Sequence, residues 1–76
     1  MRIDFALVDN ADENGDIVFS AGNTSSVPHV GDEVTLHTAG ELGAWRITHL
    51  RWDFYPPISN YGEGHVVVYG FGDKIR

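Results

Sequence analysis

Residues 29–47, HVGDEVTLHTAGELGAWRI, contain the pattern that decides the fold. Apolar and polar residues alternate on both sides of a glycine-containing turn, which we place at residues 39–43. Alternation with a period of two is typical of a strand that buries one face. Placing Leu36 opposite Ile47 brings the apolar residues of both strands to one side, so we expect a β-hairpin in this register.

The same alternation, interrupted by turn-forming residues, recurs along the chain, and no window shows the period of a helix. We expect five strands, over residues 2–8, 17–21, 33–38, 44–54 and 65–71. In the fourth strand, Trp45 and Ile47 are out of phase with Leu50 and Trp52, and a bulge or bend near Thr48–His49 would direct both sets to one interior. The last strand is apolar in both phases, so we expect it to be central or covered on both faces.

Length and composition fit one small domain rich in turns. The chain has 76 residues, nine glycines and three prolines. Many glycines between short alternating segments are typical of all-β proteins. A long strand that bends to serve two sheets is characteristic of small orthogonal barrels. We therefore expect an all-β fold, a five-stranded antiparallel SH3-like barrel or roll, that spans residues 1–76 as a single domain.

The charge is strongly asymmetric along the chain. The net charge is −6, and residues 1–33 hold seven acidic side chains against Arg2 alone. Five basic residues in all are few for contact with a phosphate backbone, so the balance favours a basic protein partner over direct nucleic-acid binding. No cysteine is present, and no apolar run approaches the roughly 20 residues that cross a membrane. We expect a cytoplasmic protein without disulfides and without membrane contact.

Candidate binding residues lie in an acidic turn, DNADENGD over residues 9–16, and in a segment rich in proline and glycine over residues 55–64. We expect partner contacts from Asp9, Asp12, Glu13, Asp16, Tyr55 and Tyr61. Carboxylates at a turn can capture a basic partner electrostatically, and exposed tyrosines are typical of binding hot spots. The alternative for the tyrosines is packing over the mouth of the barrel. The open edges of such a sheet also allow a homodimer.

Patterns for catalysis, metals and cofactors are incomplete. The acidic turn begins like a calcium loop, but Ala21 stands at the twelfth position, where that loop needs a bidentate Glu. The four histidines form neither HxH nor HExxH, and no serine lies in GxSxG. We therefore expect no enzyme activity, no catalytic residue, no metal and no cofactor.

The segment quoted first resembles the KOW motif of SH3-like barrels. The residues that fit its skeleton are Gly31, Asp32, Val34, Leu36, Gly40, Gly43 and Ile47. The resemblance covers about a quarter of the chain and implies a barrel; such modules contact RNA or partners in transcription and the ribosome. Glu41 and Leu42 stand where that family has basic residues, which speaks against contact with nucleic acid.

The profile of a very small, acidic, cysteine-free chain without a catalytic constellation is similar to that of phage-encoded inhibitors of host defence, anti-CRISPR proteins among them. We therefore expect a small acidic protein-binding module. In its most specific form it is a phage or mobile-element inhibitor that blocks a nucleic-acid-handling host protein through its acidic surface. The alternative is a KOW/SH3-like domain that binds RNA, or a transcription or ribosomal partner, with Arg46 and Arg51 on its surface.

Overall fold

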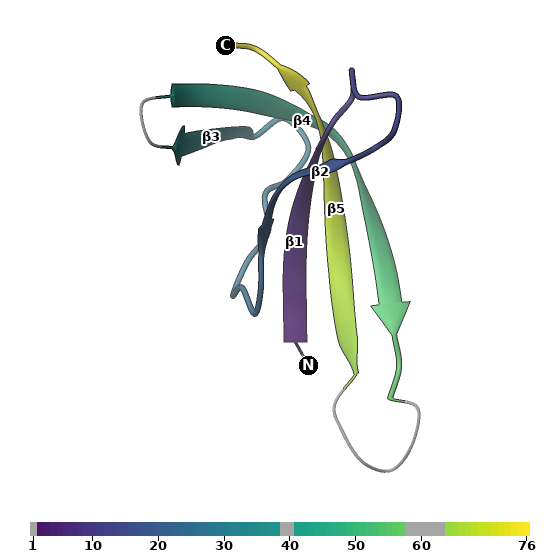
Figure 1. Ribbon diagram of the computed structural model, residues 1–76. Coiled ribbons are helices and arrows are strands. Elements are labelled where there is room, and N and C mark those ends of the chain that lie inside the picture. The colour runs from purple at the N-terminus through teal and green to yellow at the C-terminus, as the bar shows by residue number, and fades with distance from the viewer. Residues whose placement is uncertain (1, 39–40, 58–63) are drawn as a thin grey trace.

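A computed structural model describes residues 2–38, 41–57 and 64–76, which form five strands (Figure 1). The strands are β1 (Arg2–Asp9), β2 (Ile17–Ala21), β3 (Glu33–Thr38), β4 (Glu41–Tyr55) and β5 (His65–Lys74). No helix occurs among the described residues, so an all-β fold with five strands is confirmed. In particular, that part of the chain contains no helix of the length and apolarity that would cross a membrane.

The strands form one curled sheet, a half-barrel, in the order β2-β1-β5-β4-β3 (Figure 1). Three neighbouring pairs are antiparallel, but β1 and β5 run parallel, so the sheet is mixed. The prediction of a fully antiparallel sheet is therefore wrong at this one pair. Alternating apolar residues look the same in either strand direction, and the partner of β1 lies at the other end of the chain.

The long strand β4 bends because it carries a bulge. β4 pairs with β3 over residues 41–46 and with β5 over residues 45–55, and the register to β5 shifts between Ile47 and His49. The predicted bulge near Thr48–His49 is confirmed. The Asn10 side-chain amide donates to Thr48 Oγ1 and to Asp73 Oδ1, both at 2.9 Å, and Thr48 Oγ1 donates to the Phe71 carbonyl at 3.0 Å. These bonds fix the bend in place.

The core lies on the concave face of the sheet. Its buried side chains are Phe5, Leu7, Trp45, Ile47, Val66 and Val68, with Leu50 partly buried against them. The bulge brings Leu50 onto the same face as Ile47, as its parity requires. Gly70 lies at the centre of this face, where a Cβ atom would stand 2.8 Å from the Phe5 ring, so only glycine fits under that ring.

The hairpin between β3 and β4 has a different register from the predicted one. Leu36 lies opposite Gly43 rather than Ile47, and β4 already begins at Glu41. The predicted turn over residues 39–43 is therefore wrong. A shift by four residues keeps every side chain on its face, so the apolar pattern cannot distinguish the two registers. Within β4 itself, Gly43 leaves room for the Trp45 ring, which would stand 2.7 Å from a Cβ atom at position 43.

Candidate partner-binding face

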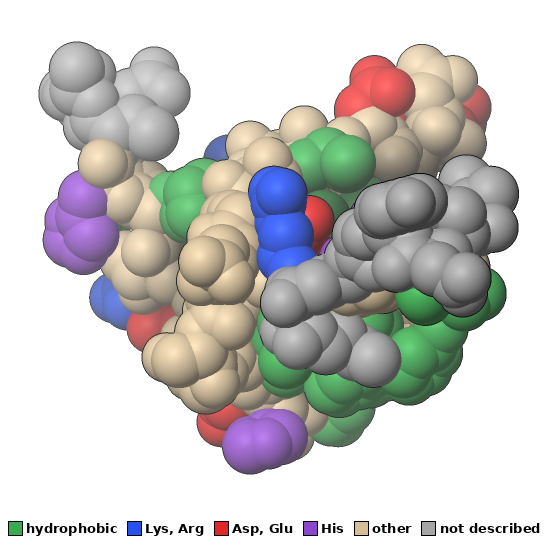
Figure 2. All heavy atoms as spheres, turned by 90° about the horizontal axis from the view of Figure 1, so that it is seen from below, with side chains coloured by type: hydrophobic (Ala, Val, Ile, Leu, Met, Phe, Trp, Pro, Cys, Tyr) green, Lys and Arg blue, Asp and Glu red, His purple; other side chains and the backbone are tan. Residues whose placement is uncertain are grey.

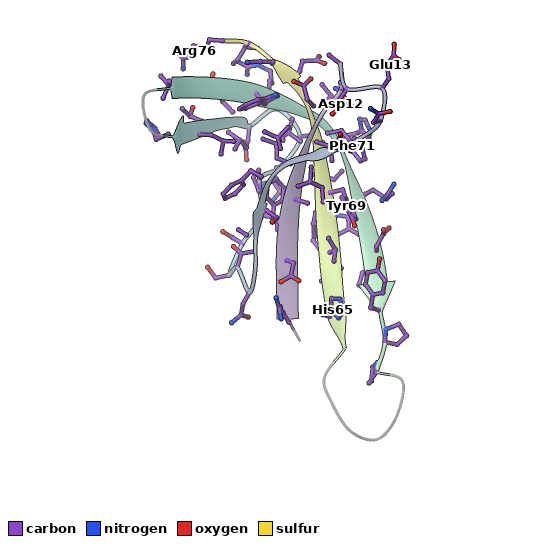
Figure 3. All side chains as sticks on the ribbon, in the orientation of Figure 1. Asp12, Glu13, His65, Tyr69, Phe71 and Arg76 are labelled. Atoms are coloured by element: carbon purple, nitrogen blue, oxygen red, sulfur yellow. The ribbon has the colours of Figure 1, made fainter. Side chains whose placement is uncertain are left out.

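The convex face of the β4–β5 pair carries four directly opposed pairs of side chains, which we call the ladder. Val66 and Val68 point into the core, so the residues that alternate with them point outward. The ladder pairs are His49–Phe71, Arg51–Tyr69, Asp53–Val67 and Tyr55–His65. Figure 3 shows His65 at one end of β5 and Tyr69 and Phe71 farther along the same strand. The ladder thus runs along the central, best-supported strand of the sheet.

The side chains of the ladder are ordered by stacking against one another. The His49 and Phe71 rings are nearly parallel with centroids 4.4 Å apart, and Tyr55 stacks on His65 at 4.8 Å. The Arg51 guanidinium carbon lies 4.5 Å from the Tyr69 ring centroid, a cation–π contact. Side chains that already share one geometry lose less entropy when a partner covers them.

One charge pair completes the ladder. Arg51 Nε lies 3.2 Å from Asp53 Oδ1, on the same strand two residues away. The side chain of Arg51 is 56% exposed and that of Asp53 is 32% exposed. Because the pair is open to solvent, it is weak by itself and remains free to exchange partners.

Asp9, predicted to contact a partner, is used inside the fold. Its Oδ2 accepts a hydrogen bond from the Trp45 indole Nε1 at 3.0 Å, and its Oδ1 accepts one from the Ala11 backbone N–H at 2.9 Å. These bonds, with a smaller attraction from Lys74, hold the pKa of Asp9 below its usual value. The carboxylate is half-buried at the start of the turn, so we assign it a structural role.

Two of the other three acidic residues of the turn are exposed, and Asp12 is partly exposed. Asp12 Oδ1 accepts from the Asn14 backbone N–H at 2.9 Å, and Gly15 closes the turn with φ 69°. Glu13 and Asp16 are exposed, and neither has a hydrogen bond or ion pair among the described residues. Asp12 and Glu13 lie near the Phe71 end of the sheet and far from His65 (Figure 3). The turn therefore adds negative charge beside one end of the ladder.

The opposite end of the ladder borders an apolar pocket. The pocket has a volume of about 250 Å³. Its lining residues are Phe54, Tyr55, Pro56, Pro57, Gly64 and His65. Figure 2 shows hydrophobic side chains gathered on one side of this end of the molecule. Tyr55, predicted as an anchor, is 45% exposed at the pocket rim, while Tyr61 lies outside the described residues.

Several remaining acidic residues are already paired with basic ones. Asp4 Oδ1 accepts from the Asn23 backbone N–H at 2.9 Å and from Arg2 Nε at 2.8 Å. These two bonds, the first having the larger effect, lower the pKa of Asp4. Glu33 lies 3.0 Å from Arg76. Glu13 and Asp16 of the turn are exposed, and among the described residues neither has a basic partner.

Sequence reasoning missed the ladder as a site. The prediction that the last strand is central is confirmed, because β5 lies between β1 and β4. Its outer face is nevertheless only partly covered, since Val67, Tyr69 and Phe71 keep intermediate exposure. The available signal was the alternation of His49, Arg51, Asp53 and Tyr55, polar or amphipathic residues out of phase with the apolar ones.

No metal-binding group of three or more His, Cys, Asp or Glu side chains is found within residues 2–38, 41–57 and 64–76. Comparison of the chain with protein-family models, with curated proteins and with solved structures gave no match.

Proposed function

We propose that the chain is a small protein-binding module whose contact surface is the ladder together with the acidic turn. The observation that carries this proposal is the row of stacked Tyr, Phe, His and Arg side chains on the outer face of β4 and β5. Tyrosine and arginine are enriched among residues that dominate binding energy. Asp12, Glu13 and Asp16 supply the negative field that would attract a basic partner and speed its association.

In its most specific form, this module is a phage or mobile-element inhibitor that blocks a nucleic-acid-handling protein of the host. The net charge of −6 supports this version, because a phosphate-binding channel is basic and accepts carboxylates in place of phosphates. We also propose that the half-barrel is of the SH3-like type. The turn at Gly31 and Asp32 before β3 and the bent strand β4 support that assignment, whereas the parallel β1–β5 pair counts against it.

The experiment is affinity capture of a partner from host lysate, followed by titration of the identified partner. The first variant combines Asp12→Asn, Glu13→Gln and Asp16→Asn, which removes the negative charge of these three carboxylates from the turn. In the second, Arg51→Gln removes the cation of the ladder. Arg46→Gln is the matched control, because Arg46 is 55% exposed and Arg51 is 56% exposed.

We expect the turn variant to slow association and lose its salt dependence, and Arg51→Gln to weaken binding by about tenfold, the effect of a moderate hot spot. Arg46→Gln should bind like the unchanged protein. Equal binding by all three variants would place the contact surface elsewhere.

The second candidate function is RNA binding, because outward aromatic rings beside an arginine are also a platform on which bases stack. Titration with labelled single-stranded RNA at two salt concentrations separates the two functions. Binding to RNA at micromolar protein that weakens with added salt would favour this alternative. We expect no such binding, because the net charge of −6 repels phosphate.

A further inference from the structure

The second half of β4 is an open edge of the sheet. β3 pairs with β4 only as far as Arg46, and the turn before β3 adds bonds between Gly31 N and Ile47 O, at 2.8 Å, and between Ile47 N and Asp32 O, at 2.9 Å. Beyond this point β4 pairs with β5 on one side, and among the described residues no strand lies on its other side (Figure 1).

The open edge has defined ends. The bulge between Ile47 and His49 closes it at one end, and the pair Pro56–Pro57, which cannot donate backbone hydrogen bonds, closes it at the other. What remains is the segment 49–55, HLRWDFY, with Trp52 at its midpoint. An edge of this length without a proline or lysine is a template for pairing with another strand.

We propose that two copies of the chain pair antiparallel along this edge, around a two-fold axis that passes through Trp52. In this register, Trp52 lies opposite its own equivalent. Arg51 of each copy lies opposite Asp53 of the other, Leu50 opposite Phe54, and His49 opposite Tyr55. Directly opposed residues of an antiparallel pair share a face, so both ion pairs form on the ladder side and all apolar contacts form on the core side.

Charge selects this register over its neighbours. A two-fold axis through Arg51 would place two arginines opposite each other, and an axis through Asp53 would place two aspartates opposite each other; both arrangements are unfavourable. A shift by one residue would set Trp52 opposite Arg51 and join the core face of one copy to the ladder face of the other. Axes through Leu50 or Phe54 would keep the faces and avoid like charges, but they would pair only about three residues of the segment 49–55 and would leave Arg51 and Asp53 unmatched. The axis through Trp52 pairs the whole segment and sets Arg51 opposite Asp53.

The pairing would also cover apolar surface that the single chain leaves open. Trp52 is 46% exposed and Phe54 is 65% exposed, and their rings stack with centroids 6.4 Å apart on the core side of the edge. Pairing lays each Phe54 against Leu50 of the other copy. The aromatic rings of the ladder stay on the outer face in both copies, so the dimer leaves them open to a partner, whereas Arg51 and Asp53 belong to both surfaces. The dimer is argued from the edge and does not rest on the proposed function.

The first test is disulfide trapping. Because the chain has no cysteine, an introduced cysteine can form a disulfide only with its equivalent in a second copy. Trp52→Cys places two thiols at the two-fold axis, within the separation that a disulfide spans. The matched control is Val18→Cys on β2, the other apolar edge, where the native side chain is 40% exposed. Under mild oxidation we expect Trp52→Cys to form a species of twice 8.4 kDa at least tenfold faster than the control. Equal rates, or a faster control, would overturn the proposal.

The second test exchanges the charges and leaves Trp52 in place. Arg51→Glu and Asp53→Arg should each weaken dimerisation by about tenfold or more in sedimentation equilibrium, because each creates two like-charge pairs. The double variant restores opposite charges across the axis and should recover the dimer, with circular dichroism confirming the fold of all three. A double variant as weak as the single ones would overturn the proposal. The proposal would also be overturned if the unchanged chain stayed monomeric up to about 1 mM. The open edge would then be available to pair with an extended peptide of another protein.

Discussion

Replacing Asp9 by alanine tests whether the first carboxylate of the acidic turn stabilises the fold or serves a partner. The Trp45 side chain is only 6% exposed, and its indole N–H donates to Asp9 Oδ2 at 3.0 Å. Removal of the carboxylate would leave that donor without an acceptor in a place that water reaches poorly. The substitution also removes the bond from Asp9 Oδ1 to the Ala11 backbone N–H, which shapes the turn.

The expected loss of stability is large for so short a chain. An unsatisfied buried donor costs about 1–3 kcal/mol, and the lost turn bond adds about 0.5–1.5 kcal/mol. At the usual 0.05–0.15 kcal/mol per residue, a chain of 76 residues is stable by about 4–11 kcal/mol in total. We therefore expect Asp9→Ala to lower the melting temperature by about 4–8 °C for each kcal/mol lost.

The assay is urea unfolding followed by far-ultraviolet circular dichroism, for Asp9→Ala, Trp45→Phe and the double variant. Phenylalanine keeps a ring in the core but has no N–H, so Asp9→Ala should cost about 1–3 kcal/mol less in that background. Asp16→Ala is the control, exposed in the same turn and expected to change stability by no more than about 0.5 kcal/mol. The reasoning is refuted if Asp9→Ala costs the same with tryptophan or phenylalanine at position 45, or no more than the control.

Three further predictions concern the core, acid stability and the bulge. Gly70→Ala should destabilise the fold by about 1–3 kcal/mol in the same assay, since its Cβ atom would stand 2.8 Å from Phe5; an increase in stability would contradict this. Asp4 and Asp9 have pKa values below their usual 3.8, so their contribution to stability is complete above pH 3.8 and is lost as the pH falls through the lower folded values. A pH series of melting temperatures should therefore decline below pH 3.8, less steeply in Asp9→Asn; equal slopes would contradict this. Deletion of Thr48 should abolish cooperative unfolding, whereas Thr48→Ala should cost about 1 kcal/mol, and similar effects of the two changes would refute the role of the bulge.

The strands of this fold could be predicted from the sequence because alternation states which residues share a face. The bulge could also be predicted, since Trp45 and Ile47 have one parity and Leu50 and Trp52 the other, and a single core cannot accept both without an extra residue. The hairpin register could not, because a shift by four residues changes no face. The structure pairs Leu36 with Gly43 and Val34 with Trp45, a register that lies four residues from the predicted one.

The candidate site could be predicted only in part. The turn itself could be predicted, because Asn-Gly favours a tight turn at the surface, and the structure leaves Glu13 and Asp16 exposed there. The same reasoning treated Asp9 as one more free carboxylate, since a hydrogen bond to a residue 36 positions away leaves no local pattern. The parallel pairing of β1 with β5 could not be predicted for the same reason, because it joins strands at the two ends of the chain.

The bulge at Thr48 connects the acidic turn, the ladder and the open edge. One extra residue reverses the parity of β4, so Leu50 faces the core while Arg51 and Asp53 face outward. Without it, either the apolar residues after position 48 or those before it would face water. The same residue limits the open edge at one end and, through Asn10, holds the acidic turn beside the ladder. The convex surface and the self-complementary edge are thus two consequences of one irregularity, which a single deletion removes together.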